Sequence, residues 1–162
     1  MKYNNIIAAM TLMAVLITFT CFSPLVRAQT GTAPQARCSV EINSLKDGDK
    51  VGESVTVRGN ATIPADGNLW LLAHKSSMGN QWWPQAGPIE IKNGEWQAEV
   101  FFGRSRDVGS NFEVAAVVVN HETNTALTKW FSTARTSDYP PVVFPDANSS
   151  CSVVKVTVVK TA

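Results

Sequence analysis

From residue 38 onward, short apolar stretches alternate with turn sequences rich in Gly, Asp, Asn and Pro. Cys38–Ile42 and Val55–Arg58 alternate apolar and polar side chains, as half-buried strands do. Leu69–His74 and Phe112–Val119 are apolar at nearly every position, and the pattern predicts that the latter is a central strand. Val153–Val159, rich in β-branched residues, is the last predicted strand.

The clearest local prediction is a hairpin. Ile89–Lys92 and Glu95–Phe102 alternate in polarity and are joined by Asn93-Gly94. Asn-Gly is a strong hairpin signal because a type I′ turn needs positive φ at both central residues. The apolar residues of the second arm share one face, which predicts that this face is core: Trp96, Ala98, Val100 and Phe102.

One region near residues 123–135 has helical rather than strand periodicity, although a strand there is the alternative. The proline-rich stretch 137–145 predicts no regular element. About seven short strands separated by turns, with a single helix candidate, predict an all-β immunoglobulin-like antiparallel sandwich rather than an alternating α/β fold. The apolar residues at helical spacing are Ala126, Leu127, Trp130 and Phe131.

The first 28 residues have the form of a cleavable export signal. Lys2 supplies a positive start, Ile6–Phe22 is uncharged and largely apolar, and Val26-Arg27-Ala28 places small residues before a cleavage point after Ala28. A membrane anchor is one alternative, but the apolar run is short for a span of about 20 residues. A lipoprotein modified at Cys21 is another, and the residues before Cys21 fit that signal poorly.

Cleavage leaves 134 residues, enough for one domain with its own core. We predict a flexible lead over residues 29–37 and a single domain over 38–160. The signal carries two of the 14 basic residues and none of the 13 acidic ones, so the mature net charge is −1. That near-neutral balance argues against nucleic acid or an anionic membrane surface as partner, and no later segment of the sequence predicts a membrane span.

Cleavage also removes one of the three cysteines and leaves Cys38 and Cys151. An even number of cysteines in an exported chain predicts a disulfide. The predicted location of the protein is extracytoplasmic, either periplasmic or secreted. Two separate thiols in a reducing compartment are the alternative.

A resemblance covers roughly Cys38 to Val119. It is carried mainly by Trp82-Trp83-Pro84-Gln85 and by Phe102-Gly103 followed by Asp107-Val108-Gly109. This pattern is similar to small immunoglobulin-like or fibronectin-III-like domains of bacterial exported and membrane-attached proteins, often of unassigned function. The resemblance implies a sandwich with an accessory or binding role and no catalytic residues. It departs from the immunoglobulin pattern because Cys38 and Cys151 lie at the ends of the domain and would link terminal strands.

The sequence offers no motif for catalysis, metal or cofactor. His74 and His121 lack partners at metal-ligand spacing, and no nucleophile elbow or phosphate-binding glycine loop is present. Asp47, Asp49 and Glu53 surround a turn, and we interpret them as turn residues rather than as a calcium loop because ligands at fixed spacing are missing. We therefore expect no enzyme, no cofactor and no metal site.

The five tryptophans are the unusual feature of so short a chain. If the segment is extended, the adjacent Trp82 and Trp83 point to opposite faces, so one of them is a candidate surface anchor. The alternative is that both are structural. Trp82, Trp83 and Trp70 are the candidate binding residues, whereas Trp96 is predicted to be core.

Three functions remain open at this level. The preferred hypothesis is a non-catalytic binding or accessory domain of the cell envelope or exterior, with a protein as ligand. The alternatives are a carbohydrate-binding module that uses the exposed tryptophans and a hydrolase of unrecognised type.

Overall fold

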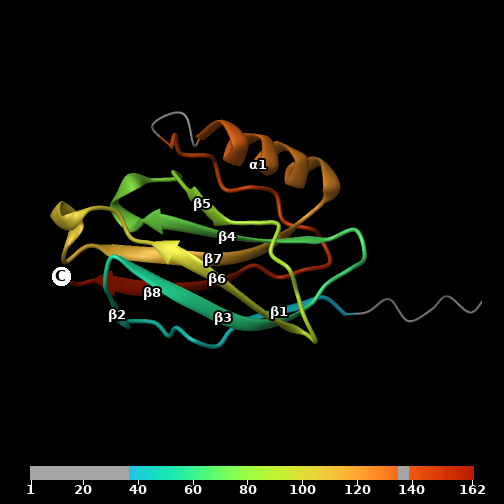
Figure 1. Ribbon diagram of the computed structural model, residues 1–162, viewed down its shortest axis with the longest axis horizontal. Coiled ribbons are helices and arrows are strands. Elements are labelled where there is room, and N and C mark those ends of the chain that lie inside the picture. Colours follow the sequence, from blue (N-terminus) through green and yellow to red (C-terminus); the bar gives the residue numbers. More distant parts are fainter. Residues whose placement is uncertain (1–36, 135–138) are drawn as a thin grey trace, which may run out of the picture. The chain divides into compact units, whose positions relative to one another are not determined.

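Two β-sheets pack face to face in the computed structural model, which describes residues 37–134 and 139–162 (Figure 1). The predicted signal peptide, residues 1–28, and residues 29–36 of the predicted lead lie outside the described residues; Arg37 is exposed and in no regular element. The first sheet has the order β1-β3-β6 and the second the order β2-β8-β7-β4-β5. The strands are β1 (Ser39–Ile42), β2 (Lys50–Val51), β3 (Ser54–Thr62), β4 (Asn68–Lys75), β5 (Trp83–Ala86), β6 (Glu95–Phe101), β7 (Asn111–Val119) and β8 (Val154–Lys160).

All strand pairs are antiparallel except the short β2–β8 pair. The predicted all-β, immunoglobulin-like sandwich is confirmed, and β7 is a central strand of its sheet, as its apolar sequence indicates. The two strands that the sequence pattern did not predict are β2 and β5.

The main core lies between the sheets and is built from alternate residues of their strands. Trp96 is 3% exposed and belongs to this core, as predicted, together with Val100 and Phe102 of the same face. Opposite residues such as Leu69 and Leu71 of β4 are fully buried. Burial of these side chains at about 25 cal/mol per Å² of apolar surface is the principal driving force for pairing the two sheets.

A second core covers the outer face of the second sheet. Helix α1 (His121–Ala134) and the segment 139–147 lie over Trp70 and Leu72 of β4 and over Val117 of β7. In Figure 1 the helix lies above the second sheet and the first sheet lies below it. Because β4 and β7 are covered on both faces, nearly every residue in them is buried, which explains their unbroken apolar sequences.

The predicted short helix is confirmed and begins two residues earlier than the sequence suggested. Asn120 precedes it, and its side-chain Oδ1 accepts a hydrogen bond of 2.9 Å from the Thr123 backbone N–H, the arrangement of an N-cap. Leu127 is the helix residue that is buried in the second core, at 5% exposure.

The predicted hairpin is correct at its turn and wrong in its first arm. Asn93 and Gly94 have φ of 54° and 82°, and Lys92 and Glu95 exchange two backbone hydrogen bonds of 2.9 Å. Pairing stops there, however, and Ile89–Lys92 is not a strand. The Ile89 N–H instead donates to the Leu69 carbonyl in the second sheet, because this segment carries the chain from β5 across to β6.

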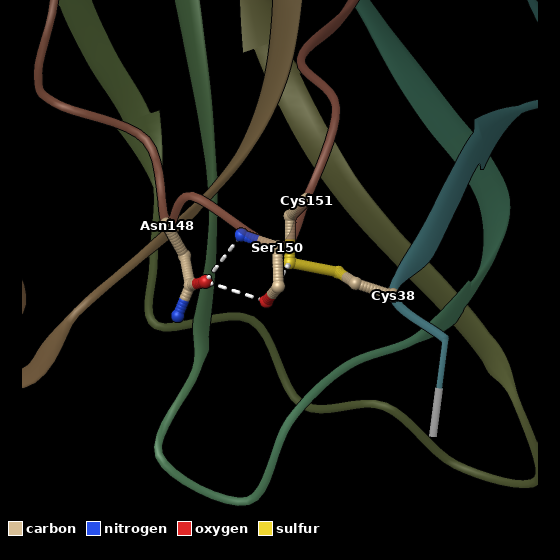
Figure 2. Close-up of a disulfide and its surroundings, with 4 residues drawn as sticks. All are labelled: Cys38, Asn148, Ser150 and Cys151. Carbon is tan, nitrogen blue, oxygen red and sulfur yellow. Dashed lines mark hydrogen bonds between the residues drawn. A yellow bond between two sulfur atoms is a disulfide. The ribbon is translucent and has the colours of Figure 1, made fainter. Parts of the chain in front are cut away.

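The predicted disulfide between Cys38 and Cys151 is confirmed (Figure 2). It joins the residue before β1, in the first sheet, to the segment that leads into β8, in the second, with a Cα–Cα distance of 5.0 Å. Asn148 supports the Cys151 side: its Oδ1 accepts hydrogen bonds from the Ser150 N–H and hydroxyl, at 3.0 and 2.6 Å. Among the residues described, no helix has the length and apolar character needed to span a membrane.

Candidate binding groove

An open groove of about 1090 Å³ is formed where several elements converge. The end of β4, strand β5 and the last residue of β6 form one part of it. The loop after β6, which contains the short 3₁₀ turn η2 (Ser105–Asp107), and the segment 139–141 form a second part, and β7 and α1 add Phe112 and Phe131. A second short turn, η1 (Ser76–Met78), contributes Met78.

Large apolar side chains are exposed in this groove. Met78, Phe101 and Tyr139 are 41%, 54% and 50% exposed, and all three line it. Only two other large hydrophobic residues in the described ranges are as exposed, Val108 and Val143. Apolar side chains that gather in one hollow, rather than being scattered singly, indicate an interaction surface.

Of the three tryptophans predicted as binding residues, only Trp83 lines the groove. It is half-buried, and its ring N–H donates a hydrogen bond of 2.9 Å to the Tyr139 carbonyl. This bond holds Trp83 in place and fixes segment 139–141 at the groove wall.

Trp82 is 3% exposed and belongs to the second core. Its ring stacks on His74 with a centroid separation of 4.7 Å, meets Phe144 edge to face at 4.8 Å, and lies 4.7 Å from the Lys155 Nζ. Trp82 and Val142 also exchange backbone hydrogen bonds of 2.9 and 2.8 Å. Of the two adjacent tryptophans, Trp82 is therefore the buried one and Trp83 is the one at the groove.

Trp70 has no exposed surface and packs beneath α1. Its ring N–H donates to the Asn124 Oδ1 at 2.9 Å, and its ring meets Phe131 edge to face. Neither Trp70 nor Trp82 presents a ring face to solvent, so a surface role falls to Trp83 alone among the three.

The rest of the Trp-Trp-Pro-Gln motif ties the two sheets together beside the groove. Gln85 accepts a hydrogen bond of 2.9 Å from the Phe101 backbone N–H through its Oε1, and its Nε2 donates to the Trp83 carbonyl at 3.2 Å. The side-chain amide of Gln85 thus bonds one backbone N–H on β6 and one backbone carbonyl on β5. Both strands lie at sheet edges, where such backbone groups are otherwise unpaired. Gln85 therefore fixes Phe101 relative to Trp83.

The loop after β6 forms the basic end of the groove. Asp107 accepts hydrogen bonds of 2.8 Å from the Arg104 backbone N–H and from the Lys75 Nζ. The backbone N–H of Arg104, followed by Lys75, lowers the pKa of Asp107 below its ordinary value, so this carboxyl is ionised at neutral pH. The Arg104 and Arg106 side chains are exposed, and neither takes part in an ion pair within residues 37–134 and 139–162.

His74 is the one histidine at the groove and is buried. Its Nδ1 lies 2.8 Å from the Gln81 carbonyl oxygen, to which it donates, and its Nε2 lies 4.0 Å from a Glu113 oxygen. No hydroxyl or thiol of a described residue bonds either ring nitrogen, so the arrangement lacks the nucleophile–base contact of covalent catalysis. Nor do the described residues contain a group of three or more His, Cys, Asp or Glu placed to hold a metal.

A second hollow, of about 780 Å³, lies beside β3 and β6, and its lining mixes polar and apolar residues. Trp96 borders it, and the ring N–H of Trp96 has no hydrogen-bond partner among the described residues. That N–H is closed off from solvent within the main core, so a molecule in the hollow would not reach it. Exposed apolar side chains distinguish the first groove from this one.

Phe101, Gln85, Tyr139 and the two arginines are groove residues that the sequence pattern did not single out. Phe101 carried a detectable signal, because it follows Glu95, Gln97 and Glu99 on the wet face of its strand. A large aromatic residue on the solvent-facing side of a strand is unusual and indicates a contact with another segment or another molecule. Tyr139 lies in a proline-rich stretch with no periodicity, so nothing in the sequence marks it.

No model of a known protein family matches this chain, and no curated protein is detectably similar to it in sequence. The function must therefore be argued from the geometry of the groove.

Proposed function

We propose that this protein is an exported, non-catalytic binding domain of the cell envelope or exterior, and that it binds a protein ligand in the groove. The observation that carries the proposal is that Met78, Phe101 and Tyr139, all exposed, line the same groove as the half-buried Trp83. Aromatic residues and methionine are enriched where proteins bind one another, and a few such anchors supply most of the binding energy.

A protein ligand fits this wall better than a sugar does. Stacking on a sugar ring requires a flat aromatic face open to solvent, whereas Trp83 is half-buried and its ring is held by Tyr139. The flexible Met78 and the isolated Phe101 ring are suited to the irregular apolar side chains of a peptide. The exposed ring of Tyr139 is the feature that keeps a carbohydrate ligand as the second candidate.

Export is supported by the signal-like pattern of residues 1–28 and by the disulfide, which persists in oxidising compartments outside the cytoplasm. In such a compartment, envelope or extracellular proteins would be the available partners of the domain.

The test uses the full chain, expressed with its own N-terminal segment in a bacterial host and recovered from the periplasm. The mass of the recovered protein checks cleavage after Ala28. A phage-displayed library of random peptides is then selected on this protein, and the affinity of enriched peptides is measured for Phe101→Ser and for the matched control Val143→Ser. Val143 is 71% exposed and does not line the groove.

We expect Phe101→Ser to weaken binding by about tenfold or more, as loss of an anchor worth about 1.4 kcal/mol or more does, and Val143→Ser to change it by less than about twofold. Peptides that bind both variants like the parent protein would place the site elsewhere. If no peptide is enriched and a glycan array gives ligands that Phe101→Ser releases, the carbohydrate alternative replaces the protein ligand.

A further inference from the structure

The charges that line the groove are unbalanced. Among the described residues they are the cations Lys75, Arg104 and Arg106 and a single carboxylate, Asp107. Lys75 and Asp107 neutralise each other across 2.8 Å, so the two arginines supply the net charge of this lining.

Both arginines lie on a loop whose backbone is already fixed. Asp107 accepts the Arg104 N–H through Oδ2 and the Lys75 Nζ through Oδ1, and the Ser110 N–H donates to the Asp107 carbonyl at 3.0 Å. Asp107 forms its ion pair with Lys75 and none with either guanidinium group, although the charge of Arg106 attracts its carboxylate and contributes weakly to the lowered pKa of Asp107. A fixed backbone that carries two unpaired guanidinium groups is preorganised for an anionic group of another molecule.

Charge and apolar surface together define the ligand. We propose that the groove accepts an acidic segment of a partner protein, with apolar side chains against Met78 and Phe101 and carboxylates against Arg104 and Arg106. Guanidinium forks match carboxylates in a two-point geometry, which gives this end of the groove its specificity. The inference rests on the proposed function, because it specifies the class of protein segment that the groove would bind.

Two other anionic occupants fit less well. Proteins that bind anionic bilayers by charge use clusters of roughly four to eight basic residues, whereas this lining has two unpaired ones. A sulfated polysaccharide would satisfy the arginines and leave Met78 and Phe101 without apolar contacts. The chain's own residues 1–36 contain no Asp or Glu, so they do not provide the acidic segment.

The probes are two random copolymers, one of glutamate and tyrosine and one of lysine and tyrosine, together with polyglutamate and dextran sulfate. Binding of each to the periplasmic protein is measured by biolayer interferometry at low and at raised salt. The variants are Arg104→Gln/Arg106→Gln, Phe101→Ser and the control Lys46→Gln/Lys50→Gln, which makes the same charge change on exposed residues outside the groove.

We expect the glutamate–tyrosine copolymer to bind at least about tenfold more tightly than the lysine–tyrosine copolymer and than polyglutamate. Arg104→Gln/Arg106→Gln should weaken that binding by about two- to thirtyfold, the range expected for two partly exposed charge contacts. Phe101→Ser should also weaken it, and the lysine control should leave it within about twofold. Raised salt should remove most of the difference between parent and arginine variant, because exposed charges are screened.

Three results would overturn the inference. The first would be that the lysine–tyrosine copolymer binds as well as the glutamate–tyrosine copolymer. The second would be that dextran sulfate or polyglutamate alone binds as tightly as the glutamate–tyrosine copolymer. The third would be that the arginine variant behaves like the lysine control. In each case the peptide selection decides the proposed function separately: peptides that Phe101→Ser releases would retain the groove as a protein site without acidic specificity. If no peptide or copolymer depends on Phe101, the proposed function fails as well.

Discussion

At the scale of single residues, the side chains that shape the groove act mainly by holding backbone. Gln85 joins the edges of β5 and β6, Trp83 holds Tyr139, and Asp107 closes the loop after β6. The side chains left free by these contacts are apolar or cationic: Met78, Phe101, Arg104 and Arg106. A rigid frame with free contact residues loses little conformational entropy on binding, which favours affinity.

Asp107 gives a residue-scale prediction. Its pKa is lower in the folded chain than in the unfolded one, so the ionised carboxyl stabilises the fold above the unfolded value of about 3.9. This stability is lost as the pH falls through the lower, folded-state pKa. We expect Asp107→Asn to reduce the free energy of unfolding by about 1 kcal/mol at neutral pH, a figure that allows for solvent screening, and by progressively less below pH of about 4.

Urea unfolding across a pH series measures this difference. The exposed Asp66 provides the control, since Asp66→Asn removes a carboxylate with no ion pair or hydrogen bond to its side chain among the described residues. An Asp107→Asn deficit that stays constant from neutral to acid pH would contradict the assignment.

At the scale of elements, α1 and segment 139–147 turn a two-layer sandwich into one whose second sheet is covered on both faces. This cover buries Trp70 and Trp82, two of the three tryptophans predicted as binding residues. It also brings Tyr139, which follows the helix in sequence, to the groove. The helix therefore determines which aromatic residues remain available for contact.

Leu127 tests the role of the helix. It is 5% exposed against the sheet, so Leu127→Ala should lower the free energy of unfolding by about 2–4 kcal/mol through lost burial and a residual cavity. Thr128 is exposed on the same helix, and Thr128→Ala should change it by less than about 0.5 kcal/mol. Urea denaturation followed by circular dichroism gives both values, and equal effects would mean that α1 does not contribute a packed core.

At the scale of the whole molecule, the disulfide links the first sheet to the second near the two ends of the domain sequence. Its cysteines are 113 residues apart, so the bond closes a loop that contains nearly all of the strands. In the chain-entropy account, constraining so long a loop in the unfolded chain stabilises the fold by a few kcal/mol, and the mechanism is model-dependent.

We expect Cys38→Ser/Cys151→Ser to lower the free energy of unfolding by about 2–5 kcal/mol. Reduction of the parent protein should reproduce that loss, as measured by urea unfolding with and without reductant. The double variant is its own control, because reductant should leave its unfolding midpoint unchanged. A parent midpoint that is insensitive to complete reduction would show that the bond adds no stability.

The sequence by itself determined the elements that depend on local pattern. Period-two alternation identified β1, β3 and β6, β-branched residues identified β8, unbroken apolar runs identified β4 and β7, helical spacing identified α1, and Asn93-Gly94 fixed a turn. The even cysteine count in a chain with an export-like start indicated the disulfide. These features succeed because backbone geometry imposes a short period, or a fixed residue type, on neighbouring positions.

Only the tertiary structure decided the rest. Ile89–Lys92 has the alternation of a strand, yet its Ile89 N–H donates to Leu69 of the second sheet and only Lys92 pairs with β6. The path of the chain between the sheets, rather than local propensity, determines this pairing. Likewise, Trp82 and Trp83 are equivalent in the sequence, and it is the cover of α1 and segment 139–147 that buries the first and leaves the second at the groove. Residues far apart in the chain form that groove, and no local period records which of them meet.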